Sequence, residues 1–153
     1  MVLTDKWFTT LASDDNGAVI IVNGRLDLEK FRSTGKLKHR IEIRLPYEAD
    51  EKGMPTRQAE KIIAEVESLL RPKMERDKLA ILTGNHLGGG TKYWVFYART
   101  DQVFFERLNE ALESLPLLPL EFDNELDPTW SEYCDMLLMD PEDEEDEEED
   151  SLP

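Results

Sequence analysis

The chain has 153 residues, of which 40% are hydrophobic and 34% charged, a composition typical of one globular domain with its own core. The longest apolar runs, AVIIV and LPLLPL, are far shorter than the roughly 20 residues that span a bilayer, and MVLTDKWFTT has no basic region followed by an apolar block. The one cysteine, Cys134, excludes an internal disulfide and is expected to be a buried core thiol. These features predict a cytoplasmic protein and exclude a membrane segment.

The formal net charge of −16 is concentrated near the C-terminus, where DPEDEEDEEED (residues 140–150) contains ten carboxylates. Mutual repulsion adds to an ordering cost of about 1–2 kcal/mol per residue, so we predict one domain over 1–139 and a disordered acidic tail over 140–153. An acidic surface repels nucleic acid, so a basic protein partner is favoured, with a purely solubilising tail as the alternative. The tail residues expected to bind such a partner are Glu142, Asp143, Glu144, Glu145, Asp146, Glu147, Glu148, Glu149 and Asp150.

The first predicted elements are a β-hairpin and a half-buried strand. DKWFTTLA and AVIIVN flank SDDNG, where Asn16 and Gly17 can adopt the positive φ angles of a tight turn. The next segment, GRLDLEKFRSTGK, has no clear pattern. LKHRIEIRLPYE alternates apolar with charged residues, so one face of this strand is expected to be buried and the other wet. The expected buried residues are His39, Ile41, Ile43 and Leu45.

The clearest helix is TRQAEKIIAEVESLLRPK, with Thr56 as its N-cap and Pro72 as its end. Two strands, KLAILTG and KYWVFYAR, then flank three consecutive glycines. A phosphate-binding loop needs a lysine and a hydroxyl directly after its last glycine, at the start of a helix. Here Lys92 leads into an aromatic strand instead. The glycines therefore predict a long, mobile hairpin loop that includes His86.

A second helix, TDQVFFERLNEALESL, is predicted to end before Pro116, and LLPLEF is expected to form the last strand. LDPTWSEYCDMLL predicts a short closing helix with Asp127 as N-cap and Pro128 in the first helical position. From His39 to Phe122 the order is strand, helix, strand, strand, helix, strand. This order predicts an α+β fold of the ferredoxin-like split βαβ type, with an antiparallel sheet and two helices on one face. The N-terminal hairpin should extend the sheet, and the closing helix should cover exposed apolar surface.

No pattern of catalytic or metal-binding residues accompanies these elements. The two histidines, His39 and His86, match no zinc spacing, and the chain contains no G-x-S-x-G. We therefore predict a non-catalytic interaction domain without metal or cofactor, acting as a monomer or homodimer. The alternative is a small-molecule or peptide-binding domain, or an enzyme, with a cleft between the open sheet face and the closing helix. The cleft candidates are Trp94, Tyr97, Trp130 and Tyr133.

Seven segments together resemble a bacterial family, domain of unknown function 695. They are KWFTT, AVIIVN, IEIRL, EKIIAEVESLL, LTG followed by YWVFYA, FFERLNEAL and DPTWSEYCDML. The resemblance spans residues 7–138, and the last of these motifs is the most distinctive. Members of that family look like structural relatives of the regulator of ribonuclease E activity B, an acidic protein that inhibits an RNA-degrading enzyme by binding it. The resemblance implies the same fold and, by analogy, an inhibitor or regulator of a basic, nuclease-like partner.

Overall fold

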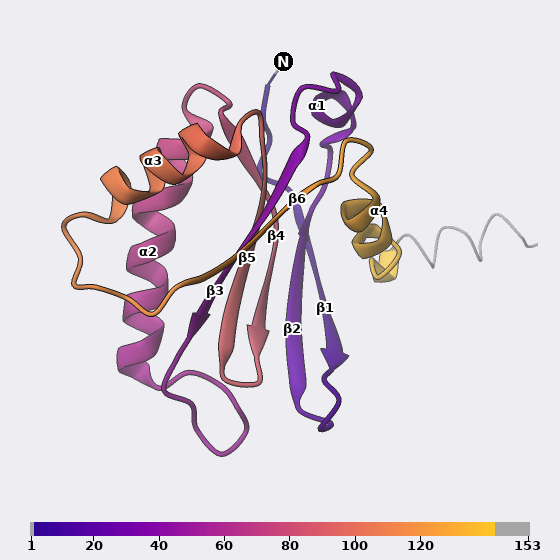
Figure 1. Ribbon diagram of the computed structural model, residues 1–153. Helices are drawn as coiled ribbons and strands as arrows, with labels where there is room; N and C mark the ends of the chain where they lie inside the picture. Colours follow the sequence, from indigo (N-terminus) through magenta and orange to yellow (C-terminus); the bar gives the residue numbers. More distant parts are fainter. Residues whose placement is uncertain (1, 143–153) are drawn as a thin grey trace, which may run out of the picture.

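The structure, a computed structural model, describes residues 2–142. These residues form an α+β arrangement around one six-stranded sheet with the strand order β1-β2-β4-β5-β3-β6. Every pair of neighbouring strands is antiparallel. Helices α2 and α3 lie side by side on one face of the sheet, and α4 lies against the other (Figure 1). The elements are β1 (Trp7–Ser13), β2 (Val19–Arg25), α1 (Glu29–Ser33), β3 (His39–Pro46), α2 (Arg57–Glu75), β4 (Ala80–Gly88), β5 (Thr91–Ala98), α3 (Asp101–Leu112), β6 (Glu121–Leu126) and α4 (Ser131–Leu137).

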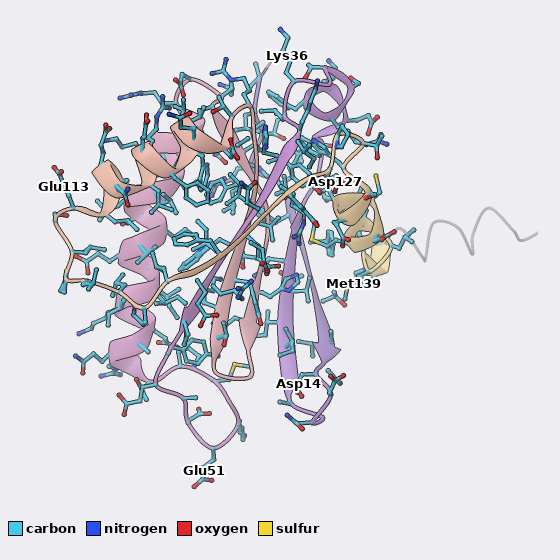
Figure 2. All side chains as sticks on the ribbon, viewed as in Figure 1. Asp14, Lys36, Glu51, Glu113, Asp127 and Met139 are labelled. Carbon is cyan, nitrogen blue, oxygen red and sulfur yellow. The ribbon has the colours of Figure 1, made fainter. Side chains whose placement is uncertain are left out.

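Alternation along the strands divides the apolar side chains between two cores. Ile41 and Ile43 of β3 are fully buried with Phe96 of β5 beneath α2 and α3, which confirms the predicted buried face of β3. His39, expected on that face, is only half-buried. Tyr97, the next residue along β5, points to the opposite face and belongs to a second core that includes Trp130. Side chains fill the space between the helices and the sheet (Figure 2).

The triple glycine closes a tight turn and not the long loop that the sequence predicted. β4 runs to Gly88, and only Gly89 and Gly90, with φ angles of 62° and 84°, separate it from β5. A Cβ atom on Gly88 would lie 2.4 Å from the carbonyl oxygen of Val19, so glycine is needed for this close approach to β2. His86 lies within β4 because β2 and β5 pair with this stretch on both sides.

Helix α2 begins as predicted but continues through Pro72. The Thr56 side chain accepts a hydrogen bond from the backbone N–H three residues later, at 3.3 Å, and is the N-cap. The expected end at Pro72 is wrong, because one further turn is held by tertiary contacts. Met74 in that turn is fully buried, and the Glu75 carboxylate accepts the N–H of Leu82 at 2.8 Å. Tertiary packing therefore outweighs the local cost of proline in the helix.

The last strand lies further along the chain than predicted. β6 comprises EFDNEL, whereas the expected strand LLPLEF contains Pro119, which cannot donate to a ladder. In the observed register Glu121 lies opposite Arg44 and Glu125 opposite Arg40. Opposite charges on these two facing pairs stabilise this register, and Arg44 contacts both members of the third charged pair, Glu42 opposite Asp123.

Helix α4 starts at Ser131, later than predicted, and Pro128 lies in the preceding turn. Trp130 directly before the helix has a left-handed backbone with φ 58°. Asp127 still acts as a cap, because its carboxylate accepts the N–H groups of Ser131 and Glu132 at 2.9 and 3.1 Å. Asp127 thus sits where the end of β6 meets α4 (Figure 2).

Candidate functional site

The edge strand β6 presents a row of carboxylates to solvent. Among the described residues it pairs only with β3, and all six of its residues are exposed. Glu121, Asp123 and Glu125 share one face of the strand, with side chains 60%, 64% and 55% exposed. Two arginines of β3 contact this row. The Arg44 Nε lies 3.6 Å from Glu121, and an Arg40 nitrogen lies 3.7 Å from Glu125.

The charges of the facing side chains on β3 and β6 do not balance. Besides the three carboxylates of β6, Glu42 lies between the two arginines and accepts a hydrogen bond from Arg44 at 2.7 Å. Four carboxylates against two guanidinium groups leave two negative charges (4 − 2 = 2). Hydrogen bonds to Glu42 and Asp123 raise the pKa of Arg44, so the arginine stays charged and the imbalance persists at neutral pH. We call these six residues the acidic ladder; they are Arg40, Glu42, Arg44, Glu121, Asp123 and Glu125.

The opposite face of β6 is apolar or neutral. Phe122 packs edge-on against Phe105 of α3, with ring centroids 5.3 Å apart, and is 38% exposed. The Asn124 side chain donates to Asp101 at 2.9 Å, and Leu126 is 69% exposed. Next to Phe122, a hollow of about 370 Å³ is lined mostly by leucines from α3 and from residues 115–120. β6 therefore offers acids on one face and apolar contacts on the other.

Three of the four predicted cleft residues come together on the other side of the sheet, beneath α4. The rings of Tyr97 and Trp130 stack with centroids 4.5 Å apart, and Tyr133 meets Trp130 edge-on at 5.4 Å. All three are buried, so they form the floor of a packed core and not an open cleft. Trp94 lies on the opposite face, under α2, where its indole N–H donates to Glu67 at 2.9 Å.

The carboxylate of Asp127 joins this aromatic cluster to α4. The Tyr97 hydroxyl donates to it at 2.6 Å, and the Ser131 hydroxyl donates at 2.8 Å. Burial alone would raise the pKa of Asp127, but hydrogen bonds from Tyr97 and from the first turn of α4 outweigh burial and lower it. Burial, helped by this carboxylate, raises the pKa of Tyr97, so its hydroxyl remains a donor.

A hollow of about 230 Å³ lies between α4 and the sheet, beside the aromatic cluster. Arg40, His86 and Thr83 line its sheet side, and Met136 and Met139 line its helix side. The Arg40 Nε is buried and has no hydrogen-bond partner among the described residues. Burial lowers the pKa of His86, so the imidazole is neutral at neutral pH. The hollow therefore combines apolar walls with one free donor and a neutral imidazole.

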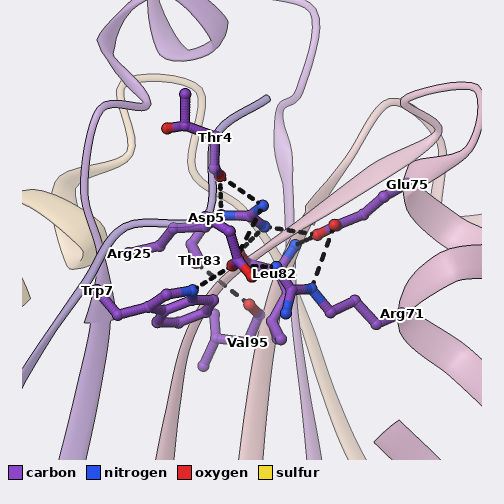
Figure 3. A network of polar contacts seen from close by, with 9 residues as sticks. All are labelled: Thr4, Asp5, Trp7, Arg25, Arg71, Glu75, Leu82, Thr83 and Val95. Carbon is purple, nitrogen blue, oxygen red and sulfur yellow. Dashed lines mark hydrogen bonds and ion pairs between the residues drawn. The ribbon is translucent and has the colours of Figure 1, made fainter. Parts of the chain in front are cut away.

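A second polar cluster, around Arg25, is fully engaged in holding the fold together (Figure 3). Its guanidinium donates to the Thr4 carbonyl at 2.8 and 3.1 Å and to Glu75 at 2.8 Å. The Trp7 ring lies 5.4 Å from each of the guanidinium groups of Arg25 and Arg71. These contacts fasten the N-terminal segment and the end of α2 to the sheet. The hydrogen bonds of the Arg25 guanidinium go to Thr4, Glu75 and Leu82, all within the fold.

The C-terminal acids lie mostly outside the described residues. Asp140 is buried at 7% exposure, and its carboxylate accepts the N–H of Glu142 at 3.0 Å. Glu142 is exposed, and the other predicted partner-binding acids, 143–150, fall outside the part of the chain that the structure describes. Within residues 2–142 there is no group of three or more His, Cys, Asp or Glu side chains arranged for a metal ion. None of the helices in this range combines the length and apolar character needed to cross a membrane.

The carboxylates of β6 are the functional candidates that the sequence reasoning missed. A signal was present, because the acids of EFDNEL recur at every second position, as the charged residues of RIEIR do. The apolar segment LLPLEF, which overlaps the start of β6, favours an earlier strand and hides this signal.

The fold and these surfaces define an α+β domain with an acidic sheet edge and a small hollow under its C-terminal helix. The chain belongs to the Family of unknown function (DUF695), whose family model matches residues 5–138. This match confirms the family resemblance found in the sequence. No curated protein and no solved structure matched the chain.

Proposed function

We propose that this protein is a non-catalytic, acidic protein-interaction domain that binds a basic partner along β6. The observation that carries the proposal is the acidic ladder, which retains two negative charges at an exposed sheet edge. Outside residues 143–150, which hold eight of the 34 acidic residues, 26 acidic residues still outnumber 18 basic ones. Such an excess attracts a basic partner over a distance and favours it over acidic competitors.

We infer further that β3 to β6, with α2 and α3, form a ferredoxin-like unit to which the β1–β2 hairpin and α4 are additions. The strand order β6-β3-β5-β4, with one helix in each crossover, supports this inference. The relationship to the regulator of ribonuclease E activity B stays a prediction from the sequence. On that analogy we favour a basic, nuclease-like enzyme as the partner and inhibition or regulation as the outcome.

The proposal is tested with two synthetic peptides of equal composition and charge. The first, KVKVKVK, alternates lysine and valine; the second, KKKKVVV, separates them. Their affinities for the full chain are measured by fluorescence anisotropy at low and raised salt. The test variant carries Glu121→Gln, Asp123→Asn and Glu125→Gln. The control variant removes the same number of charges from exposed helix positions, with Glu60→Gln, Glu65→Gln and Glu106→Gln.

We expect the peptides to bind the natural chain and the control variant, and to bind the β6 variant at least about tenfold more weakly. Affinity should fall as salt screens the charges, over a Debye length of about 8–10 Å at physiological ionic strength. Equal binding to the β6 variant and the control variant would contradict the proposal, as would the absence of binding to the natural chain.

A second candidate function, a small-molecule site, is favoured by the buried Arg40 Nε in the hollow beneath α4. An apolar ligand with an acceptor group, such as a carboxylate, fits one free donor between methionine side chains. Titration of the chain with carboxylate-bearing aromatic fragments, followed by NMR, tests this candidate. Binding should shift the signals of His86 and Met136 and should be lost in Arg40→Gln. NMR signal shifts confined to other surfaces would contradict a small-molecule site beneath α4.

A further inference from the structure

The backbone of β6 reveals which of its hydrogen-bonding groups are free. The N–H of Asp127 donates to the carbonyl of Lys38 at 2.8 Å, so this facing pair is hydrogen-bonded. In an antiparallel ladder, hydrogen-bonded pairs alternate with pairs whose N–H and C=O groups point away from each other. The N–H and C=O groups of Phe122, Asn124 and Leu126 must therefore point away from β3. Within residues 2–142 no strand lies on that side to receive them.

We propose that β6 captures an extended segment of its partner as an additional antiparallel strand, in which basic residues alternate with apolar ones. The proposal rests on the function proposed above and adds how the partner is held. Residues of the added strand that lie opposite Glu121, Asp123 and Glu125 would project onto the acidic ladder. The intervening residues would lie beside Phe122, which lines the apolar hollow at the end of α3, and beside the exposed Leu126. Alternate basic and apolar side chains match both faces at once.

A second copy of this chain is a poor occupant of the same edge. Because the free backbone groups belong to the even-numbered residues, any antiparallel β6–β6 pairing would place even residues opposite even ones and odd opposite odd. The carboxylates of Glu121, Asp123 and Glu125 would then face one another across the two copies. Like charges directly opposite destabilise a strand pair. The edge is thus protected against self-pairing and open to a basic strand.

The other edge of the sheet lacks this chemistry. β1 (Trp7–Ser13) has the sequence WFTTLAS and carries no ionisable side chain. Its backbone is available to a strand in the same way, but it offers no charge that would select a basic segment. Charge complementarity therefore favours β6 over β1 as the binding edge and favours a basic segment as its partner.

The test uses proline to remove one outward N–H of β6. Asn124→Pro deletes the N–H that an added strand needs. The backbone N–H groups of Asp123 and Glu125, which point toward β3, are kept. Asn124→Ala is the matched control, because it loses the same side-chain bond to Asp101 but keeps the N–H. We expect Asn124→Pro to weaken binding of KVKVKVK about tenfold or more and Asn124→Ala to change it less than about threefold. Urea unfolding of both variants shows whether they fold equally well.

A second measurement leaves the protein unchanged. Valine residues of KVKVKVK lie opposite the even-numbered residues of β6, so their N–H groups point toward it in an antiparallel pairing. N-methylation of the valines should abolish binding, whereas N-methylation of the inner lysines should preserve it. KVKVKVK should also bind about tenfold more tightly than KKKKVVV. Equal binding of the two methylated peptides, or of the alternating and block peptides, would overturn strand addition and leave the charge-based function standing. Loss of all binding would overturn both.

Discussion

Asp127 provides a demanding test of how the end of β6 is joined to α4. Asp127 is 6% exposed, and its carboxylate receives hydrogen bonds from the Tyr97 hydroxyl and from the first turn of α4. Asp127→Ala leaves the buried Tyr97 hydroxyl without its acceptor, which costs about 1–3 kcal/mol. It also removes the cap of α4, which costs about 0.5–2 kcal/mol. We therefore expect the free energy of unfolding to fall by about 1.5–5 kcal/mol.

The assay is equilibrium unfolding in urea, followed by tryptophan fluorescence, in a double-mutant cycle with Tyr97→Phe. Tyr97→Phe removes the donor, so Asp127→Ala should cost about 1–3 kcal/mol less in that background than in the natural chain. Additivity of the two changes within about 0.5 kcal/mol would refute the reasoning, because it would mean that the two groups do not interact. A total loss below about 1 kcal/mol would refute the assigned role of Asp127 as a cap.

Other predictions concern the glycine turn, a histidine and an arginine. Gly88→Ala should lower the free energy of unfolding in urea more than Gly90→Ala. At both positions φ is positive, so an alanine would carry a backbone strain of about 1–2 kcal/mol. At Gly88 the new Cβ would also clash with the carbonyl oxygen of Val19 in β2, whereas nothing lies within 4 Å of a Cβ at Gly90. Equal losses would argue against that close approach. Burial lowers the pKa of His86, so the unfolded chain binds its proton more readily and stability should fall as pH drops below about 6.5. His86→Gln should flatten this fall between about pH 7 and 5.5, and an unchanged slope would contradict the assignment. Arg25→Ala should cost about 3–5 kcal/mol, because it removes at once the hydrogen bonds of a buried guanidinium to Glu75, the Thr4 carbonyl and the Leu82 carbonyl. A loss below about 1 kcal/mol would show that these bonds are not essential.

Much of the fold was predictable because its periodic patterns are strong. The alternation in β3 reflects one buried and one wet face, and the stripe on α2 reflects one packed side. The β1–β2 hairpin followed from SDDNG, although only Gly17 adopts a positive φ there. In these elements local propensity and tertiary packing favour the same structure, so sequence reasoning succeeds.

The errors occur where tertiary contacts decide the outcome. Residues before the triple glycine are polar and were predicted to be loop, but two neighbouring strands pair with them. Pro72 does not end α2, because Met74, two residues later, is fully buried. Cys134, expected in the core, is only half-buried. The last strand was predicted too early in the chain, because the prediction rests on apolar character, whereas the position of β6 depends on charge pairing with β3. The acidic ladder depends on that pairing and therefore appeared only in the structure.

Residue-resolved amide hydrogen exchange, with and without KVKVKVK, tests the central claim most directly. In the free protein the outward amides of Phe122, Asn124 and Leu126 should exchange rapidly, while those of Asp123 and Glu125, bonded to β3, should exchange slowly. Addition of the peptide should slow exchange at the three outward amides and leave the rest of the sheet unchanged. If the peptide slows exchange around α4, or nowhere on β6, then β6 is not the binding surface.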